Sequence, residues 1–218
     1  MIRTRDLFSS FPEYLEKVAR ECEYPWRLLD ALPALVERLV REGIDGFSEL
    51  APGVLVGEGV TVAEGASIAP PAVIGRGTEI RHGAFLRGYV ITGEGCVIGN
   101  SSEVKGSILL AHVQIPHYNY VGDSVLGNFA HLGAGAVLSN LKLEGGEVTV
   151  RAEREYPTGR RKLGAILGDG ANVGCGAVLN PGTVICKGSV VYPLTSVRGT
   201  VPEGCIVKSS AEWVKKTE

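Results

Sequence analysis

Three side chains near the middle of the chain could together bind an anion and move a proton. His117 lies in the segment Ile-Pro-His-Tyr-Asn-Tyr-Val-Gly-Asp, residues 115–123. Imidazole suits general-base work because its unperturbed pKa is about 6.5. Lys105 lies twelve residues before His117, and Arg87 eighteen before Lys105. Lysine as a point charge and arginine as a fork can grip a phosphate. Each residue also has a plainer interpretation, as a loop histidine or as exposed surface cations.

A repeat predicts the elements that position these residues. A period of six fits neither an ordinary helix nor a hairpin sheet, and it fits a parallel β-helix in which each hexad is a short strand and a bend. Three hexads form one coil of about 18 residues, so Arg87 and Lys105 should lie on one face. The predicted fold class is therefore all-β. From Val54 onward the recurring residues are Val56, Val62, Ile68, Ile74, Ile80, Leu86, Thr92, Ile98, Val104 and Leu110, then Tyr120, Leu126, Leu132 and Leu138, then Leu167, Val173, Leu179, Ile185, Val191 and Val197.

The repeat loses its phase twice. Between Leu110 and Tyr120 the spacing is ten rather than twelve, and His117 lies in this interval. Between Leu138 and Leu167 a longer segment intervenes, and we expect a loop excursion at about residues 140–163 that ends in basic residues. Because insertions in a solenoid commonly carry its binding face, both interruptions mark the expected site.

The first 46 residues have a helical pattern instead. Apolar residues recur at spacings of three and four in two stretches, which are separated where Tyr24 precedes Pro25. Two short amphipathic helices need a surface to cover. We therefore predict a helical cap over residues 1–46 that covers one open end of the prism, and a β-helix over residues 47–205. A C-terminal tail or short helix over residues 206–218 is expected to cover the other end.

The composition argues against several classes of protein. The chain has 218 residues, thirty of them glycine, and a formal net charge of −2, which gives no reason to expect a nucleic-acid or acidic-membrane partner. No apolar run approaches about 18 residues, and the first residues lack the apolar core of a signal peptide, so we expect a soluble cytoplasmic protein. The five cysteines are widely spaced, which favours reduced thiols over disulfides or a metal site.

Three segments resemble a known family. Residues 115–123, the run Leu-Gly-Ala-Gly at 132–135 and the run Gly-Arg-Arg-Lys-Leu-Gly-Ala at 159–165 are similar to the left-handed β-helix acetyltransferase domain of the bifunctional UDP-N-acetylglucosamine pyrophosphorylase/glucosamine-1-phosphate N-acetyltransferases. The resemblance covers roughly residues 24–205. It implies a left-handed winding, acetyl-CoA as co-substrate without a metal, and a homotrimer with CoA in the groove between neighbouring prisms. No Gly-rich nucleotide loop opens the chain, so nucleotidyltransferase activity is not expected.

The resemblance also implies roles for individual residues. His117 matches the catalytic base, which would take a proton from the sugar's 2-ammonium. Glu103 would orient the imidazole, and a plain surface carboxylate is the other interpretation of that residue. Ala134 with Gly135 would meet the acetyl-CoA thioester, where a backbone N–H stabilises the oxyanion, and Cys175 would lie near CoA. The implied substrate-binding residues are Arg87, Lys105, Tyr120, His131 and Asn140.

The chain departs from the family's pattern in two places. His131 stands where the bacterial enzymes have an asparagine near the amino group, and it could bind the amine, change the preferred epimer or pack in the groove. The second departure is that the family's further lysine, from the loop after Asn140, has no clear counterpart. Its candidates are Lys142, Lys162, Arg160 and Arg161.

Asp123, near the end of the segment that contains His117, is expected to have a structural role, because it follows a glycine in a turn.

These residues predict an acetyl-CoA-dependent N-acetyltransferase that acts on an amino-sugar 1-phosphate in nucleotide-sugar biosynthesis, with glucosamine-1-phosphate first and galactosamine-1-phosphate second. The alternative is a non-catalytic β-helix subunit that binds a sugar phosphate or scaffolds a separate nucleotidyltransferase. His117, Lys105 and Arg87 at their spacings favour the enzyme, whereas His131 and the missing lysine favour the alternative. Transfer to a hydroxyl, or transfer of a longer acyl group, would use the same base.

Overall fold

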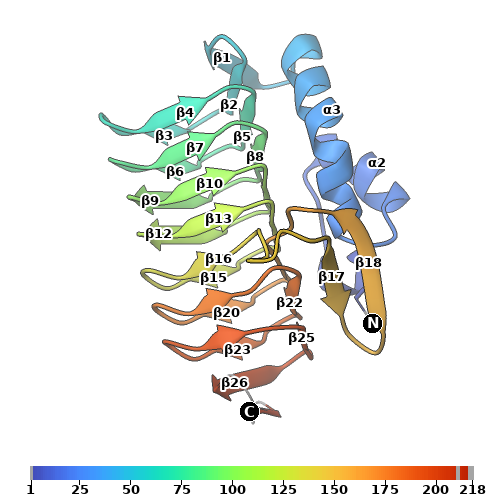
Figure 1. The fold of residues 1–218 in the computed structure, drawn as a ribbon. Coiled ribbons are helices and arrows are strands. Elements are labelled where there is room, and N and C mark those ends of the chain that lie inside the picture. The colour runs from blue at the N-terminus through green and yellow to red at the C-terminus, as the bar shows by residue number, and fades with distance from the viewer. Residues whose placement is uncertain (1, 210–211, 216–218) are drawn as a thin grey trace.

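The structure is a computed structural model that describes residues 2–209 and 212–215. Three helices precede a stack of coils built from short strands (Figure 1). The helices are α1 (Thr4–Leu7), α2 (Glu13–Glu21) and α3 (Trp26–Glu42). None of the helices within the described residues is long and apolar enough to cross a membrane.

The coils form three parallel sheets, one on each side of a prism, which we call faces A, B and C. The chain visits them in the repeating order A, B, C. Face A contains β2 (Val54–Gly57), β5 (Ala72–Ile74), β8 (Val90–Thr92), β11 (Ile108–Leu109), β14 (Val125–Leu126), β19 (Ala165–Leu167), β22 (Thr183–Ile185) and β25 (Thr200–Val201). Face B contains β3 (Thr61–Val62), β6 (Glu79–Ile80), β9 (Val97–Asn100), β12 (Gln114–His117), β15 (His131–Leu132), β20 (Asn172–Val173), β23 (Val190–Val191) and β26 (Cys205–Ser209). Face C contains β4 (Ser67–Ala69), β7 (Phe85–Arg87), β10 (Glu103–Lys105), β13 (Tyr120–Gly122), β16 (Val137–Leu138), β21 (Val178–Leu179) and β24 (Ser196–Val197).

Ladder hydrogen bonds join each coil to the next in parallel register. Val54 pairs with Ala72, 18 residues on, and Glu103 pairs with Tyr120, 17 residues on. Most aliphatic residues of the repeat fill the interior. Ile98 has no exposed surface, whereas Val62 on the first coil is 38% exposed. The prediction of an all-β, left-handed parallel β-helix is confirmed.

Two positions of the predicted repeat are wrong. The interior contains Leu109 and Val121 rather than Leu110 and Tyr120. Leu110 faces outward into a second apolar cluster, and Tyr120 is half-buried on face C. The turns from face C to face A after β10 and β13 are each one residue short, so inward residues there are five apart, as Val121 and Leu126 are.

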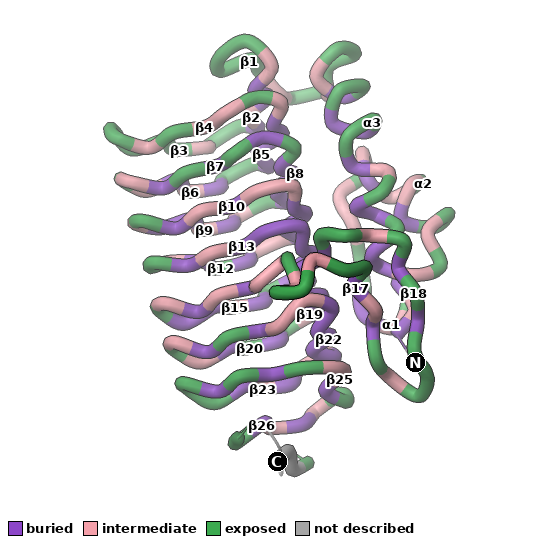
Figure 2. The backbone as a smooth tube through the Cα atoms, viewed as in Figure 1, coloured by how far each residue is buried: buried purple, intermediate pink, exposed green. Residues whose placement is uncertain are grey.

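The helices lie along face A rather than across an end of the prism (Figure 1). Figure 2 shows buried segments where the coils meet α3. The prediction that the helical cap covers an open end is therefore wrong, because the amphipathic helices bury an apolar stripe along one side instead. The outward residues of face A that form one buried cluster with the helices are Leu55, Val73, Ile91, Ile108, Val125, Ile166 and Val184.

An antiparallel strand is added at each end of the stack. β1 (Phe47–Ala51) pairs with β2 at the first coil, and β27 (Glu212–Lys215) pairs with β26 at the last. The alternative of a C-terminal helix is therefore wrong for residues 206–209 and 212–215. Residues 210–211 and 216–218 of the predicted tail lie outside the described residues.

The second interruption of the repeat folds as a β-hairpin beside the helices. β17 (Val148–Arg151) and β18 (Glu155–Arg160) pair antiparallel. Tyr156 joins the apolar cluster of the helices. Arg160 Nη1 lies 2.5 Å from Asp30 Oδ1 of α3. The hairpin therefore ties the coils to the helical cap.

Leu32→Ala in α3 should lower the free energy of unfolding by about 2–4 kcal/mol, because it opens a cavity where the helix packs on face A. Leu143→Ala in the excursion removes a fully exposed side chain and should change that energy by less than about 0.5 kcal/mol. Urea unfolding followed by circular dichroism measures both. Equal losses in the two variants would contradict the packing of α3 on face A.

Candidate active site

His117 is the last residue of β12 and lies exposed at the corner between faces B and C. Its carbonyl accepts a hydrogen bond from the Gly135 N–H of the next coil at 3.0 Å. The Ala134 carbonyl accepts one from the Gly176 N–H of the coil after that at 2.8 Å. His117, Ala134 and the exposed Cys175 therefore lie in one column along this corner.

Asn119 holds this corner from inside the prism. It is 2% exposed. Its Nδ2 donates to the carbonyls of Gly133 and Ala136 at 2.8 and 3.2 Å, and its Oδ1 accepts from the His117 N–H at 3.1 Å. Asn119 was not among the residues predicted for the site. The signal for it is a large polar residue at an inner position where other hexads carry a small one, as at Ala84.

Face C presents the predicted substrate residues outward on neighbouring strands. Arg87 is the last residue of β7, and Tyr120 is the first residue of β13. Glu103 and Lys105 are the first and last residues of β10. Glu103 pairs with Tyr120 on one side and with Phe85 on the other, and this register continued by two residues brings Lys105 beside Arg87. The two cations and the tyrosine therefore share one face.

Each cation on face C is paired with a carboxylate. Arg87 Nη1 donates to Glu103 Oε1 at 2.6 Å, and this hydrogen bond raises the pKa of Arg87. Lys105 Nζ lies 3.3 Å from Asp123 Oδ2. Among the described residues no hydrogen bond joins Glu103 to the imidazole of His117, so the orienting role of Glu103 stays a prediction.

The side chains of Asn140 and Tyr120 both lie against Gly122. The Asn140 Nδ2 donates to Asp123 Oδ2 at 2.6 Å. A Cβ added at Gly122 would lie 2.6 Å from the Tyr120 hydroxyl and 2.7 Å from the Asn140 Nδ2, so only glycine leaves room for both groups. Burial and the charges of Glu103 and Asp123 raise the pKa of Tyr120, against a lowering by the hydrogen bond from Asn140.

His131 lies on face B and is not gathered with the face C residues. It immediately precedes the inward Leu132, and its Nδ1 lies 3.1 Å from Asn172 Oδ1. Asn172 was also not predicted for the site. Within one chain, the predicted residues therefore divide into face C, the corner column and His131 on face B.

Of the four cations proposed to replace the family's further lysine, Arg160 reaches face C. Its Nη2 lies 3.9 Å from Asp123 Oδ1, while its Nη1 pairs with Asp30 of α3. Arg161 instead donates to the Gly145 carbonyl at 3.0 Å, and Lys142 lies 3.9 Å from Glu144 in the excursion. Lys162 is exposed.

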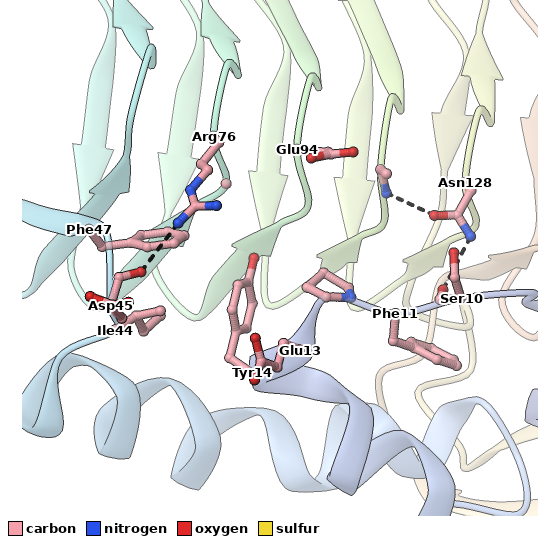
Figure 3. Close-up of a pocket in the computed structure, with 13 residues that line it drawn as sticks. Ser10, Phe11, Glu13, Tyr14, Ile44, Asp45, Phe47, Arg76, Glu94 and Asn128 are labelled. Carbon is pink, nitrogen blue, oxygen red and sulfur yellow. Dashed lines mark hydrogen bonds between the residues drawn. The ribbon is translucent and has the colours of Figure 1, made fainter.

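A cavity of about 320 Å³ lies elsewhere, between α2 and the turns from face A to face B (Figure 3). Its lining includes Phe11, Tyr14, Phe47, Arg76 and Glu94, and none of the predicted site residues. The candidate site on face C is therefore separate from this cavity. Within the described part of the chain, no group of three or more His, Cys, Asp or Glu side chains could hold a metal ion.

Comparisons with known proteins agree with the resemblance. Residues 68–155 match the family model described as the GMPPB C-terminal domain. The chain is 33% identical over 114 residues to the bifunctional protein GlmU of Methanococcus maripaludis (strain C7), covering 52% of this chain and 28% of that protein. It is 37% identical over 105 residues to a bifunctional sugar-1-phosphate nucleotidylyltransferase/acetyltransferase of Sulfurisphaera tokodaii, covering 48% and 26%.

The chain thus spans less than a third of the length of these two relatives. Among solved structures, it is similar to a point mutant of AntD, an N-acyltransferase from Bacillus cereus, with 18% identity and a TM-score of 0.48 over 80% of this chain and 92% of that one. The resemblance to the sugar-1-phosphate nucleotidyltransferase/acetyltransferases is confirmed for the matched part of the chain.

Asn119→Ala should lower the free energy of unfolding by about 2–4 kcal/mol, because it removes three hydrogen bonds at the corner, takes the acceptor from the His117 N–H and leaves the carbonyls of Gly133 and Ala136 with one donor each. Asn172→Ala, which truncates an exposed asparagine on face B, should cost less than about 1 kcal/mol. Thermal and urea unfolding measure both. A loss for Asn119→Ala no larger than for Asn172→Ala would mean that Asn119 does not hold the corner.

Proposed function

We propose that this chain is an acetyl-CoA-dependent N-acetyltransferase that acts on an amino-sugar 1-phosphate. The observation that carries the proposal is an exposed imidazole, His117, at the edge of a face that presents Arg87, Lys105 and Tyr120. A base beside a phosphate grip is what acetylation of a phosphorylated amino sugar needs. The names of the matched relatives, which include sugar-1-phosphate nucleotidylyltransferase/acetyltransferases, support the same chemistry.

In the proposed reaction, His117 takes a proton from the sugar's 2-ammonium, and the free amine attacks the thioester carbonyl of acetyl-CoA. The tetrahedral intermediate, with a protonated nitrogen and an oxyanion, then expels CoA as a thiolate, which receives a proton from the imidazolium. The extra proton on the amide nitrogen passes to water, so the products are the N-acetylated sugar, CoA thiol and one released proton. The Ala134 N–H would donate to the oxyanion. This role is supported by the exposure of Ala134 beside His117, and by the fact that no hydrogen bond of that N–H is found within the described residues.

The substrate phosphate would bind between Arg87, Lys105 and Tyr120. Because each cation is paired with a carboxylate, the phosphate must displace Glu103 from Arg87. The released Glu103 would then be able to orient the imidazole of His117, as expected from the family resemblance. Glucosamine-1-phosphate is the first proposed substrate and galactosamine-1-phosphate the second.

The proposed assembly is a homotrimer in which face B of one prism meets face C of the next. The packing of the helices on face A supports it, because faces B and C are left uncovered. Such an arrangement brings His131 and Asn172 of one protomer to the open site of its neighbour. CoA would lie in the groove along Ala134, Gly135 and Cys175. The cytoplasmic location expected from the sequence stays a prediction.

The second candidate is a non-catalytic β-helix subunit that binds a sugar phosphate or scaffolds a nucleotidyltransferase. The match of residues 68–155 to the GMPPB C-terminal domain favours it, because that description names a domain and no acetyl transfer. The separation of His131 from face C within one chain also favours it. The two candidates differ in whether CoA is released.

The wild-type protein should release CoA thiol from acetyl-CoA with glucosamine-1-phosphate, and His117→Ala should reduce kcat by at least about 100-fold because the base is lost. His82→Ala removes another exposed histidine from the same corner, two coils earlier, and should leave kcat unchanged. A thiol-release assay with glucosamine-1-phosphate, galactosamine-1-phosphate and glucosamine-6-phosphate makes the comparison. No turnover with any amino sugar would support the non-catalytic candidate.

Arg87→Ala should raise the KM for the sugar 1-phosphate about 10- to 100-fold, because it removes a charge-assisted hydrogen bond worth about 1.5–3 kcal/mol. Arg81→Ala removes a matched arginine that is paired with Glu79 at 2.9 Å on face B, and it should leave that KM unchanged. Initial-rate kinetics with acetyl-CoA at saturation measures both. An unchanged KM in Arg87→Ala would refute the phosphate grip even if acetyl transfer is observed.

A further inference from the structure

We propose that Asp123 is a positioning residue that sets the donor and acceptor directions of Asn140 and Tyr120 toward the substrate. This inference rests on the proposed function of face C. It assigns a role to a residue that the sequence pattern placed only in a turn.

The Asp123 carboxylate is held at the corner between faces C and A. Its backbone N–H donates to the Lys105 carbonyl at 2.9 Å, and its carbonyl accepts from the Gly164 N–H at 2.9 Å. Its φ of 47° lies in the left-handed region, which aspartate and asparagine tolerate. The side chain is 12% exposed. The carboxylate therefore has little freedom to turn away from its neighbours.

This carboxylate determines how the Asn140 amide is oriented. An ionised carboxylate only accepts hydrogen bonds, and an amide has a donor end and an acceptor end. Because Asn140 Nδ2 lies 2.6 Å from Asp123 Oδ2, the NH₂ group must face Asp123. The Oδ1 of Asn140 is then the end that remains to accept from a substrate hydroxyl or N–H group.

The orientation of the Asn140 amide also determines which hydrogen-bonding group of Tyr120 is left for the substrate. The Asn140 Nδ2 and the Tyr120 hydroxyl lie together over Gly122, so the second N–H of the amide is the group that meets the phenol oxygen. A phenol that accepts a hydrogen bond from the amide has its own proton left to donate. Tyr120 therefore presents a donor, which is the group that an anionic phosphate oxygen requires.

Asp123 also links the site to the helical cap. Its Oδ2 faces Lys105 Nζ at 3.3 Å, and its Oδ1 faces Arg160 Nη2 at 3.9 Å. Arg160 continues to Asp30 of α3. One carboxylate thus fixes a cation of the proposed phosphate grip, an amide and, through that amide, a phenol.

A double-mutant cycle of Asp123→Asn and Tyr120→Phe tests the inference. Asparagine keeps the shape and tolerates the backbone conformation at residue 123, but it lets the Asn140 amide reverse. Asp123→Asn should raise the KM for the sugar 1-phosphate about tenfold, equivalent to about 1.4 kcal/mol, in the presence of Tyr120. In the Tyr120→Phe background it should raise that KM by a clearly smaller factor, because the tyrosine donor is already lost and only the effects on Asn140 and Lys105 remain.

The matched control is Asp169→Asn. Asp169 accepts from Asn128 Nδ2 at 2.9 Å at the corner between faces A and B, so this change alters the same kind of pair far from face C. It should leave the KM unchanged. An Asp123→Asn effect that is equal in the two Tyr120 backgrounds, or absent from both, would overturn the inference.

A second measurement needs no turnover. In a ¹³C-tyrosine NMR titration, with Tyr120→Phe to assign the signal, Asn140→Ala should raise the pKa of Tyr120, because the donated hydrogen bond is lost. A fall, or no change, would overturn the inference. If the wild-type protein acetylates no amino-sugar phosphate, the proposed function fails, and this titration still decides whether Asn140 donates to the phenol.

Discussion

The parallel register between successive coils is the constraint on which the rest of the structure depends. Each coil pairs with the next at an offset of 17 or 18 residues before the excursion, so a side chain's place on the prism follows from its place in the hexad. This register places Arg87 beside Lys105 and stacks His117 on Ala134. Side chains of a site that stand on rigid strands are held in more precisely defined positions than side chains on loops.

The same register explains where charge accumulates. Face C carries two cations and two carboxylates in pairs, and Asp123 belongs to both a pair and an amide contact. The shortened corner at Asp123 brings this carboxylate close to its partners on two neighbouring coils. A phosphate that enters face C therefore exchanges existing ion pairs for its own instead of meeting free cations.

The interior and the shared face of Arg87 and Lys105 could be predicted from the sequence, because a strict period directly sets which residues point inward. The position of the helices could not, because the outward apolar residues of face A, such as Ile91, directly precede inward ones and read as part of the repeat. His131 was grouped with His117 by family resemblance, yet it lies fourteen residues on, which is short of a full coil, so it pairs with Gln114 within face B and does not stack on His117 at the corner. Asn119 and Asp123 escaped prediction because their roles depend on contacts between coils.

We propose that face C and its corner with face B form the substrate site, and a crystal structure of the protein with CoA and glucosamine-1-phosphate would show whether they do. We expect the phosphate between Arg87, Lys105 and Tyr120, with the amine toward His117 and CoA along the column of Ala134. A sugar phosphate found instead in the cavity beside Tyr14, with face C still holding its ion pairs, would refute this site.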